Sequence, residues 1–181
     1  MRYLLLSVIV VFGFIACNQP IKGKNGVIYK SAAQYNDYII HRQNDLIKKI
    51  EEFGAVADTN VDSAETMLDQ STKEVEKMII ELQGMPAFKG DSALRDAAAN
   101  SFSFYKQLFD NEYRAVLKIR KKRKENITED DTEEVNKVVQ DINKQEERFE
   151  KALHNAQKNF AEKNKMRLIP NKAQEENEKK F

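Results

Sequence analysis

The chain has 181 residues, enough for one domain, with 41% hydrophobic and 33% charged residues. Only six glycines and three prolines are present, which argues against an all-β or loop-rich protein because turns depend on these residues. The 30 basic and 29 acidic side chains nearly cancel, so no binding to nucleic acid or to another acidic polymer is expected.

Residues 1–16, MRYLLLSVIVVFGFIA, have the composition of a signal peptide. Arg2 precedes an apolar run that is shorter than the roughly 20 residues needed to span a bilayer. The run ends in Phe14-Ile15-Ala16-Cys17, which resembles the bacterial lipobox with Phe14 in place of the usual Leu. The resemblance implies cleavage before Cys17 and acylation of Cys17. Since Cys17 is the only cysteine, no internal disulfide competes for it, and we predict a lipoprotein anchored by its acyl chains.

Residues 18–30, NQPIKGKNGVIYK, contain Gly, Pro, Asn and Lys without periodicity. Such a composition predicts a flexible tether, so residues 17–30 are expected to comprise the lipidated cysteine and a linker that reaches up to about 40 Å. Residue 18 is Asn rather than Asp, so the common retention signal of inner-membrane lipoproteins is absent. We therefore expect the outer membrane, on either its periplasmic or its cell-surface face.

Two helices are predicted over residues 31–58 and 63–83, where apolar residues recur every three or four positions. Ser31 is the expected N-cap of the first helix, and Asp62 with Glu65 has capping-box spacing at the start of the second. Gly84 and Pro86 should end the second helix. The expected core residues are Ala32, Tyr35, Ile39, Leu46, Ile50, Phe53 and Ala57, then Ala64, Met67, Leu68, Ser71, Val75, Met78, Ile79 and Leu82.

Two longer helices are predicted over residues 92–124 and 129–165. The expected core side of the third helix comprises Leu94, Ala98, Ser101, Tyr105, Leu108, Val116 and Ile119, widened by Phe102, Phe104 and Phe109. In the fourth helix a seven-residue repeat of Val135, Ile142, Phe149 and Ala156 is joined by a second seam of Val139, Leu153 and Phe160. Such a repeat indicates left-handed packing at about 20°.

Short links at 59–62, 84–91 and 125–128 make consecutive helices antiparallel neighbours. We therefore predict an all-α fold, a left-handed up-down-up-down four-helix bundle over residues 31–166, with the longer third and fourth helices projecting past the other two. Residues 167–181 are polar and lack periodicity, which predicts a disordered tail.

Several short motifs add a resemblance to a known family. The lipobox, Tyr35-Asn36-Asp37, the segment PAFKGD over 86–91 and Phe104-Tyr105-Lys106 resemble a family of small, all-helical surface lipoproteins of uncharacterised function from spirochaetes and Bacteroidetes. The resemblance implies a helical surface lipoprotein and no assigned active-site residue.

Residues suited to chemistry are few. His41 and His154 are the only histidines, both are expected to point outward, and neither has the Glu three positions earlier that di-iron bundles use. The single cysteine is assigned to lipid, and no G-x-S-x-G motif frames a serine. We therefore expect no metal, no cofactor and no enzymatic activity, and we keep a cofactor-binding bundle as a third hypothesis.

Two clusters allow alternative interpretations. The basic run over 118–124 could bind anionic headgroups or a polyanion, but it ends one helix while Glu129, Asp130 and Asp131 begin the next, so the two runs should largely cancel. Five aromatic residues of the third helix either widen the core or form a small apolar pocket or partner groove; they are Phe102, Phe104, Tyr105, Phe109 and Tyr113.

The tripeptides Asp62-Ser63-Ala64 and Asp91-Ser92-Ala93 both occur at predicted helix starts. Each Asp is expected to cap its helix. The tripeptides also resemble a signal for O-glycosylation of exported Bacteroidetes proteins, which implies modification of Ser63 and Ser92. Together these features predict a non-enzymatic envelope lipoprotein that binds a protein or an apolar ligand; the alternative is a structural spacer or an adhesion-type surface component.

Overall fold

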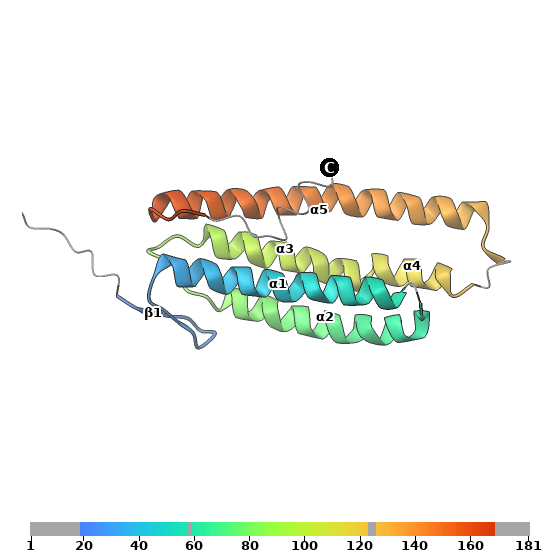
Figure 1. Cartoon of the computed structure of the whole chain (residues 1–181), viewed down its shortest axis with the longest axis horizontal. Helices are drawn as coiled ribbons and strands as arrows, with labels where there is room; N and C mark the ends of the chain where they lie inside the picture. The colour runs from blue at the N-terminus through green and yellow to red at the C-terminus, as the bar shows by residue number, and fades with distance from the viewer. Residues whose placement is uncertain (1–18, 58, 123–125, 169–181) are drawn as a thin grey trace, which may run out of the picture.

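The computed structural model describes residues 19–57, 59–122 and 126–168, which form a small hairpin followed by helices. Four long helical segments pack side by side in a bundle (Figure 1), as the sequence predicts. The elements are β1 (Ile21–Lys22), β2 (Ile28–Tyr29), α1 (Ala32–Ala57), α2 (Val61–Gln83), α3 (Ala93–Asp110), α4 (Glu112–Arg120) and α5 (Glu129–Lys163).

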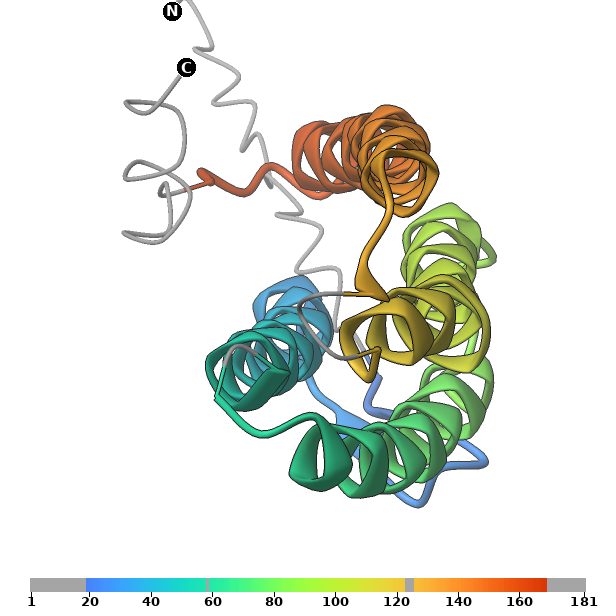
Figure 2. The same cartoon turned by 90° about the vertical axis from the view of Figure 1, so that its right-hand side faces the viewer.

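Consecutive segments run antiparallel, and the end-on view shows α2 between α1 and α3, with α5 on the far side of α3 (Figure 2). Helices α1 and α5 meet near the start of α1. There the rings of Tyr35 and Phe160 stack with centroids 5.4 Å apart, and Gln157 Nε2 donates a hydrogen bond of 3.1 Å to Gln43 Oε1. The prediction of an all-α, up-down-up-down four-helix bundle is confirmed.

Most of the predicted core is buried, including Tyr35, Ile39, Leu68, Phe102 and Phe109. These side chains recur every three or four residues and remove a continuous apolar stripe of each helix from water, which is the main stabilising term of a bundle. Seven predicted core residues are only partly buried; they are Ile50, Met67, Val116, Ile119, Val135, Phe149 and Ala156.

The prediction that Val139 belongs to the second seam of the fourth helix is wrong, because this side chain is 44% exposed. Val138 packs against the core in its place. It stands four residues before the buried Ile142 and therefore lies on the same side of the helix. Farther along, the ring of Phe149 stacks on Phe104 at 4.6 Å between centroids, so the predicted contact of Phe149 is present although the side chain is half-buried.

The predicted third helix is interrupted at Asn111, whose backbone angles of φ −121° and ψ −74° are not helical. The hydrogen bonds from Asn111 N to Gln107 O and from Ala115 N to Asn111 O, both 2.9 Å, continue across the break. Asn competes with helical geometry through local hydrogen bonding, which lowers its helix propensity. The segment therefore consists of α3 and a short α4 that ends at Arg120 rather than at Lys124.

The helix starts are capped by side chains, in part by different ones from those predicted. Ser31 Oγ accepts from Gln34 N at 3.2 Å, which confirms the cap of α1. At α2 the cap is Asn60, whose side chain accepts from Ser63 N at 3.0 Å, while Asp62 lies in the first turn. The prediction that Asp62 caps this helix is wrong because the helix begins two residues earlier.

The prediction of a flexible tether is wrong for residues 21–30, which form an antiparallel hairpin with Ile21 opposite Tyr29. The hairpin lies against the end of α2, where Asn25 N donates to Gly84 O at 3.2 Å. A Cβ atom on Gly84 would lie 2.8 Å from Asn25 N. Gly84 therefore permits this close approach, in addition to ending the helix as predicted.

Tyr35 of α1 joins three other parts of the fold: the hairpin, the α2–α3 link and α5. Its ring contacts Tyr29 of the hairpin at 5.1 Å, Phe88 of the α2–α3 link at 5.3 Å, and Phe160 of α5. Its hydroxyl donates to Pro86 O at 2.9 Å. Since the side chain is fully buried, this aromatic contact holds one end of the bundle together.

The core predicts a clear contrast in stability between two substitutions. Leu46 is buried among the helices whereas His154 is exposed. Leu46→Ala should lower the free energy of unfolding by about 2–5 kcal/mol through lost burial and a cavity, and His154→Ala by less than about 0.5 kcal/mol. Urea unfolding followed by circular dichroism measures both. A near-neutral Leu46→Ala would contradict the packing of α1.

Candidate functional site

The predicted signal peptide over 1–16, Cys17 and residues 169–181 lie outside the described residues. Cleavage and lipidation at Cys17 therefore stay predictions from the sequence. Within the described part of the chain, no helix combines the length and the apolar character needed to cross a membrane.

The two predicted glycosylation sites differ in their surroundings. Ser63 is exposed in the first turn of α2. The hydroxyl of Ser92 donates to Asp96 Oδ2 at 2.6 Å, and Asp91 Oδ1 accepts from Ala93 N at 2.9 Å. Asp91 thus helps to cap α3, as predicted. Modification stays a prediction for both serines, and the geometry favours Ser63 as the more accessible acceptor.

The histidines lie on separate helices, His41 on α1 and His154 on α5, and both are exposed. Among residues 19–57, 59–122 and 126–168, the structure places no three His, Cys, Asp or Glu side chains together in a group that could hold a metal ion. The two histidines therefore lie where the sequence analysis expects them, on the solvent side of their helices.

The aromatic residues of the third helical segment pack within the bundle. Phe102 and Phe109 are fully buried, and Tyr113 stacks on Phe53 of α1 at 5.0 Å between ring centroids. Tyr105 donates a hydrogen bond of 2.6 Å to Glu146 Oε1 of α5. Of the two interpretations of this cluster, the structure supports a wide core contact that joins three helices.

Two lysines of the basic run over 118–124 are paired with acidic side chains, and positions 123 and 124 lie outside the described residues. Lys122 Nζ lies 2.6 Å from Asp131 Oδ1 at the start of α5, as the predicted neutralisation requires. Lys121 Nζ instead contacts Glu65 at 2.5 Å and Asp62 at 3.1 Å, both in the first turns of α2. This second set of partners could not be predicted from the sequence, because it depends on α2 and α4 lying side by side.

A shallow hollow of about 410 Å³ lies between the hairpin and the first three turns of α1. The hairpin supplies apolar groups and one buried ring, and α1 supplies polar side chains. The lining residues are Val27, Ile28, Tyr29, Lys30, Gln34, Asp37, Tyr38 and His41. We take this hollow as the candidate binding site of the bundle.

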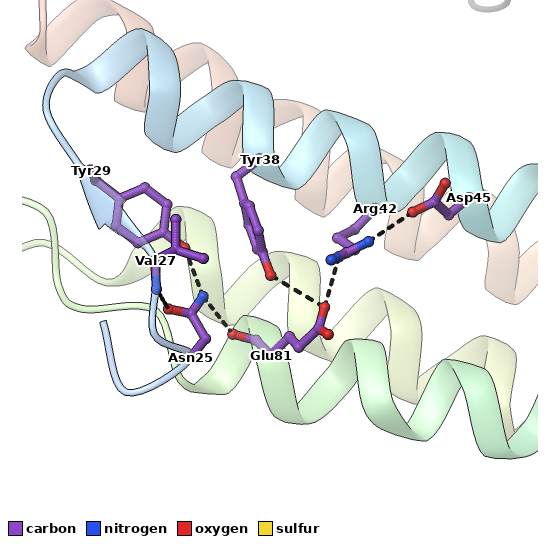
Figure 3. Close-up of polar contacts among 7 residues, drawn as sticks. All are labelled: Asn25, Val27, Tyr29, Tyr38, Arg42, Asp45 and Glu81. Carbon is purple, nitrogen blue, oxygen red and sulfur yellow. Dashed lines mark hydrogen bonds and ion pairs between the residues drawn. The ribbon is translucent and has the colours of Figure 1, made fainter. Parts of the chain in front are cut away.

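Hydrogen bonds fix the wall formed by the hairpin (Figure 3). Asn25 Nδ2 donates to Tyr29 Oη at 2.7 Å and to the carbonyl oxygen of Glu81 at 3.2 Å. Asn25 Oδ1 accepts from Val27 N at 3.2 Å. One side chain thus connects the turn of the hairpin, its second strand and helix α2, so the wall is held in one position.

A second group of polar contacts fixes the wall formed by α1. Tyr38 donates to Glu81 Oε2 at 3.2 Å, and Arg42 Nε forms an ion pair of 2.8 Å with the same oxygen (Figure 3). Arg42 also contacts Asp45 at 2.9 Å and lies over the ring of Tyr38. These half-buried pairs align the side chains and contribute modest stability.

The electrostatics of the hollow keep its tyrosines protonated. Burial raises the pKa of Tyr29 to about 12, against the opposing effect of its hydrogen bond from Asn25. Burial also raises the pKa of Tyr38 above 10.0. At neutral pH both phenols are uncharged, while Lys30 and Asp37 place charges of both signs at the rim. The exposed lining of the hollow is therefore mostly apolar, and its polar groups lie at the rim.

Comparisons of the chain with protein-family models, with curated proteins and with solved structures find no match. The resemblance to small helical lipoproteins stays a prediction that depends on the quoted motifs. The candidate site depends on the geometry of this chain.

Burial of the tyrosines predicts that their ionisation at alkaline pH is coupled to a loss of stability. Burial is the main cause that raises the pKa of all five tyrosines among the described residues above 10.0. The stability that such groups contribute is fully present below pH 10 and is lost as the pH rises through their folded values. Tyrosinate absorbance should therefore rise above pH 10 in the native protein, with Tyr29 near pH 12, while stability falls.

Protein unfolded in urea is the control and should ionise around pH 10. Tyr29→Phe should reduce the absorbance change near pH 12 and flatten the loss of stability there. Ionisation of the native protein with a midpoint at pH 10, before any loss of helicity, would contradict the packing of these rings.

Proposed function

We propose that the protein is a lipid-anchored component of the bacterial cell envelope, in the outer membrane, whose helical bundle binds a protein partner or a small ligand and performs no chemistry. The observation that carries the proposal is the apolar segment over 1–16 that ends in Cys17 within a lipobox-like sequence. The acyl chains on Cys17 supply the anchor, and the bundle supplies the binding surface.

The docked hairpin supports a close connection between the anchor and the bundle. Ile21, the first residue of β1, stands four residues after Cys17. Four residues of chain span at most about 14 Å, much less than the expected tether. The end of the bundle that carries the hairpin is thus held near the membrane surface.

The hollow beside the hairpin supports the binding role. Its walls are fixed by Asn25 and Glu81, and its rim offers Lys30, Asp37 and His41. Fixed walls reduce the entropy that a ligand or a partner segment loses on binding. A hollow this shallow leaves most of a small ligand in water, so a segment of a partner protein is the favoured occupant.

The alternative function is a structural spacer or an adhesion-type surface component. The class of partner and the face of the outer membrane on which the bundle stands separate it from the first proposal. Partners from the envelope machinery favour the binding module, and host or matrix partners favour adhesion. Protease treatment of intact cells identifies the face, because only a cell-surface bundle is digested.

The anchor is tested by Cys17→Ser. The variant should accumulate as a precursor that still carries residues 1–16 and takes up no labelled fatty acid, because the acylated thiol is absent. Metabolic labelling and the intact mass of the protein measure both effects. Ser63→Ala is the matched control and should be processed and acylated normally. Acylation of the Cys17→Ser protein would overturn the lipoprotein proposal.

The binding surface is tested by a photo-crosslinking amino acid at Asp37, an exposed residue at the rim of the hollow. Irradiation of intact cells should yield a discrete adduct, because a bound partner segment would cover this position. The same amino acid at Lys144, exposed on α5, is the control. Identical adduct patterns at the two positions would contradict the assignment of the hollow.

A further inference from the structure

The end of the bundle nearest to Cys17 is built from four segments that are distant in the sequence. They are the hairpin, the start of α1, the α2–α3 link over 84–92, and the residues that follow α5 (Figure 1). Asn25 N donates to Gly84 O, and Lys163 forms an ion pair of 2.5 Å with Asp91. These contacts join the segments into one surface, which we call the anchor end.

The anchor end carries an excess of positive charge. Among the described residues, six basic side chains of these segments are exposed and have no ion pair; they are Lys22, Lys24, Lys30, Lys89, Lys165 and Arg167. Lys22 belongs to β1, and the other five lie in a turn, in a link or just beyond a helix. Nearby acidic groups are fewer and partly occupied: Asp91 is paired with Lys163 and Asp96 with Arg95. Asp37 and Glu162 are the exposed carboxylates that remain there.

The opposite end differs in charge. Its lysines at 121 and 122 are paired with Asp62, Glu65 and Asp131. The exposed Lys118 is outnumbered by Glu129 and Asp130, which add exposed negative charge in the first turn of α5. Among the described residues, basic side chains without an ion pair are therefore concentrated at the anchor end. This is the end at which the chain leads to Cys17.

Exposed apolar side chains accompany the positive charges. Ile28 of the hairpin is 51% exposed and Leu168, beyond α5, is 37% exposed. Lysines around exposed aliphatic groups are typical of surfaces that lie at the boundary between headgroups and acyl chains. The anchor end thus has both the charge and the apolar contacts that a membrane surface requires.

The short connection brings these charges within electrostatic range of the membrane. The attraction of an anionic leaflet falls off over a Debye length, about 8 Å at physiological ionic strength. The chain between Cys17 and Ile21 spans at most about 14 Å. The lysines in and beside β1 can therefore approach the headgroups to within this range.

We propose that the anchor end docks on the phosphate groups of anionic lipids in the leaflet that holds the acyl chains, so that the bundle stands with α4 and the start of α5 pointing away from the membrane. The inference rests on the proposed acylation of Cys17. It adds an orientation and a lipid class, because acyl chains alone would bind neutral and anionic membranes equally.

The test uses the mature acylated protein, whose intact mass confirms the lipid, in vesicles of phosphatidylcholine alone or mixed with phosphatidylglycerol. A fluorophore is attached through Ala87→Cys in the α2–α3 link or through Glu133→Cys on α5, both exposed positions. Energy transfer to an acceptor on the lipid headgroups measures the distance of each end from the bilayer. At position 87 it should increase with phosphatidylglycerol and fall at high salt. At position 133 it should stay lower.

Two matched triple variants separate the anchor end from the rest of the surface. Lys22→Gln, Lys24→Gln and Lys89→Gln together should lower the ratio of docked to undocked bundle by about fivefold per lysine. Lys73→Gln, Lys137→Gln and Lys144→Gln remove three exposed lysines from the sides of the bundle and should leave that ratio unchanged. Circular dichroism checks that both variants keep their helices.

The outcomes distinguish this inference from the proposed function. Equal energy transfer in both vesicle types, or greater transfer at position 133 than at position 87, would overturn the docking and leave the anchor intact. Equal loss of transfer in both triple variants would also overturn it. If the mature protein carries no lipid and does not bind phosphatidylcholine vesicles, the proposed function and this inference both fail.

Discussion

The contact of Tyr35 with three other parts of the chain is the interaction on which one end of the molecule depends. Its ring touches the hairpin, the α2–α3 link and α5, and its hydroxyl satisfies the carbonyl of Pro86. Without the ring of Tyr35, Tyr29 of the hairpin and Phe160 of α5 would each lose an aromatic neighbour. The candidate hollow and the anchor end both follow from it, because each uses a segment that these rings hold in place.

Charge supplies a second organising principle, one that composition conceals. The balance of acidic and basic residues suggests an electrostatically neutral particle, but folding pairs the basic residues Lys121 and Lys122 with acids and leaves those of the hairpin unpaired. A chain with balanced charges can therefore fold so that unpaired positive charges gather at one end. In an anchored protein such a distribution determines which end faces the membrane.

The helices could be predicted from the sequence because their apolar periodicity is a local property, and Leu46, Leu68 and Phe102 lie where it places them. The hairpin could not be predicted, because two-residue strands have no periodicity and their order comes from Asn25 binding groups of α2. The helix break at Asn111 and the N-cap at Asn60 could not be predicted from the sequence for a related reason. Each depends on which of several suitable polar residues meets the local backbone. The hollow was missed because it needs the hairpin.

The hairpin of the proposed lipoprotein can dock only after α2 has followed it during export. Asn25 and its acceptor on Glu81 are 56 residues apart, and Gly84, the other partner, comes later still. In a chain that crosses the membrane N-terminus first, the hairpin has nothing to dock on until α2 has followed it. Until then the segment after Cys17 is not held against the bundle, which leaves an interval for the proposed processing at Cys17. Docking of the hairpin on α2 then leaves only the few residues between Cys17 and Ile21 as a linker.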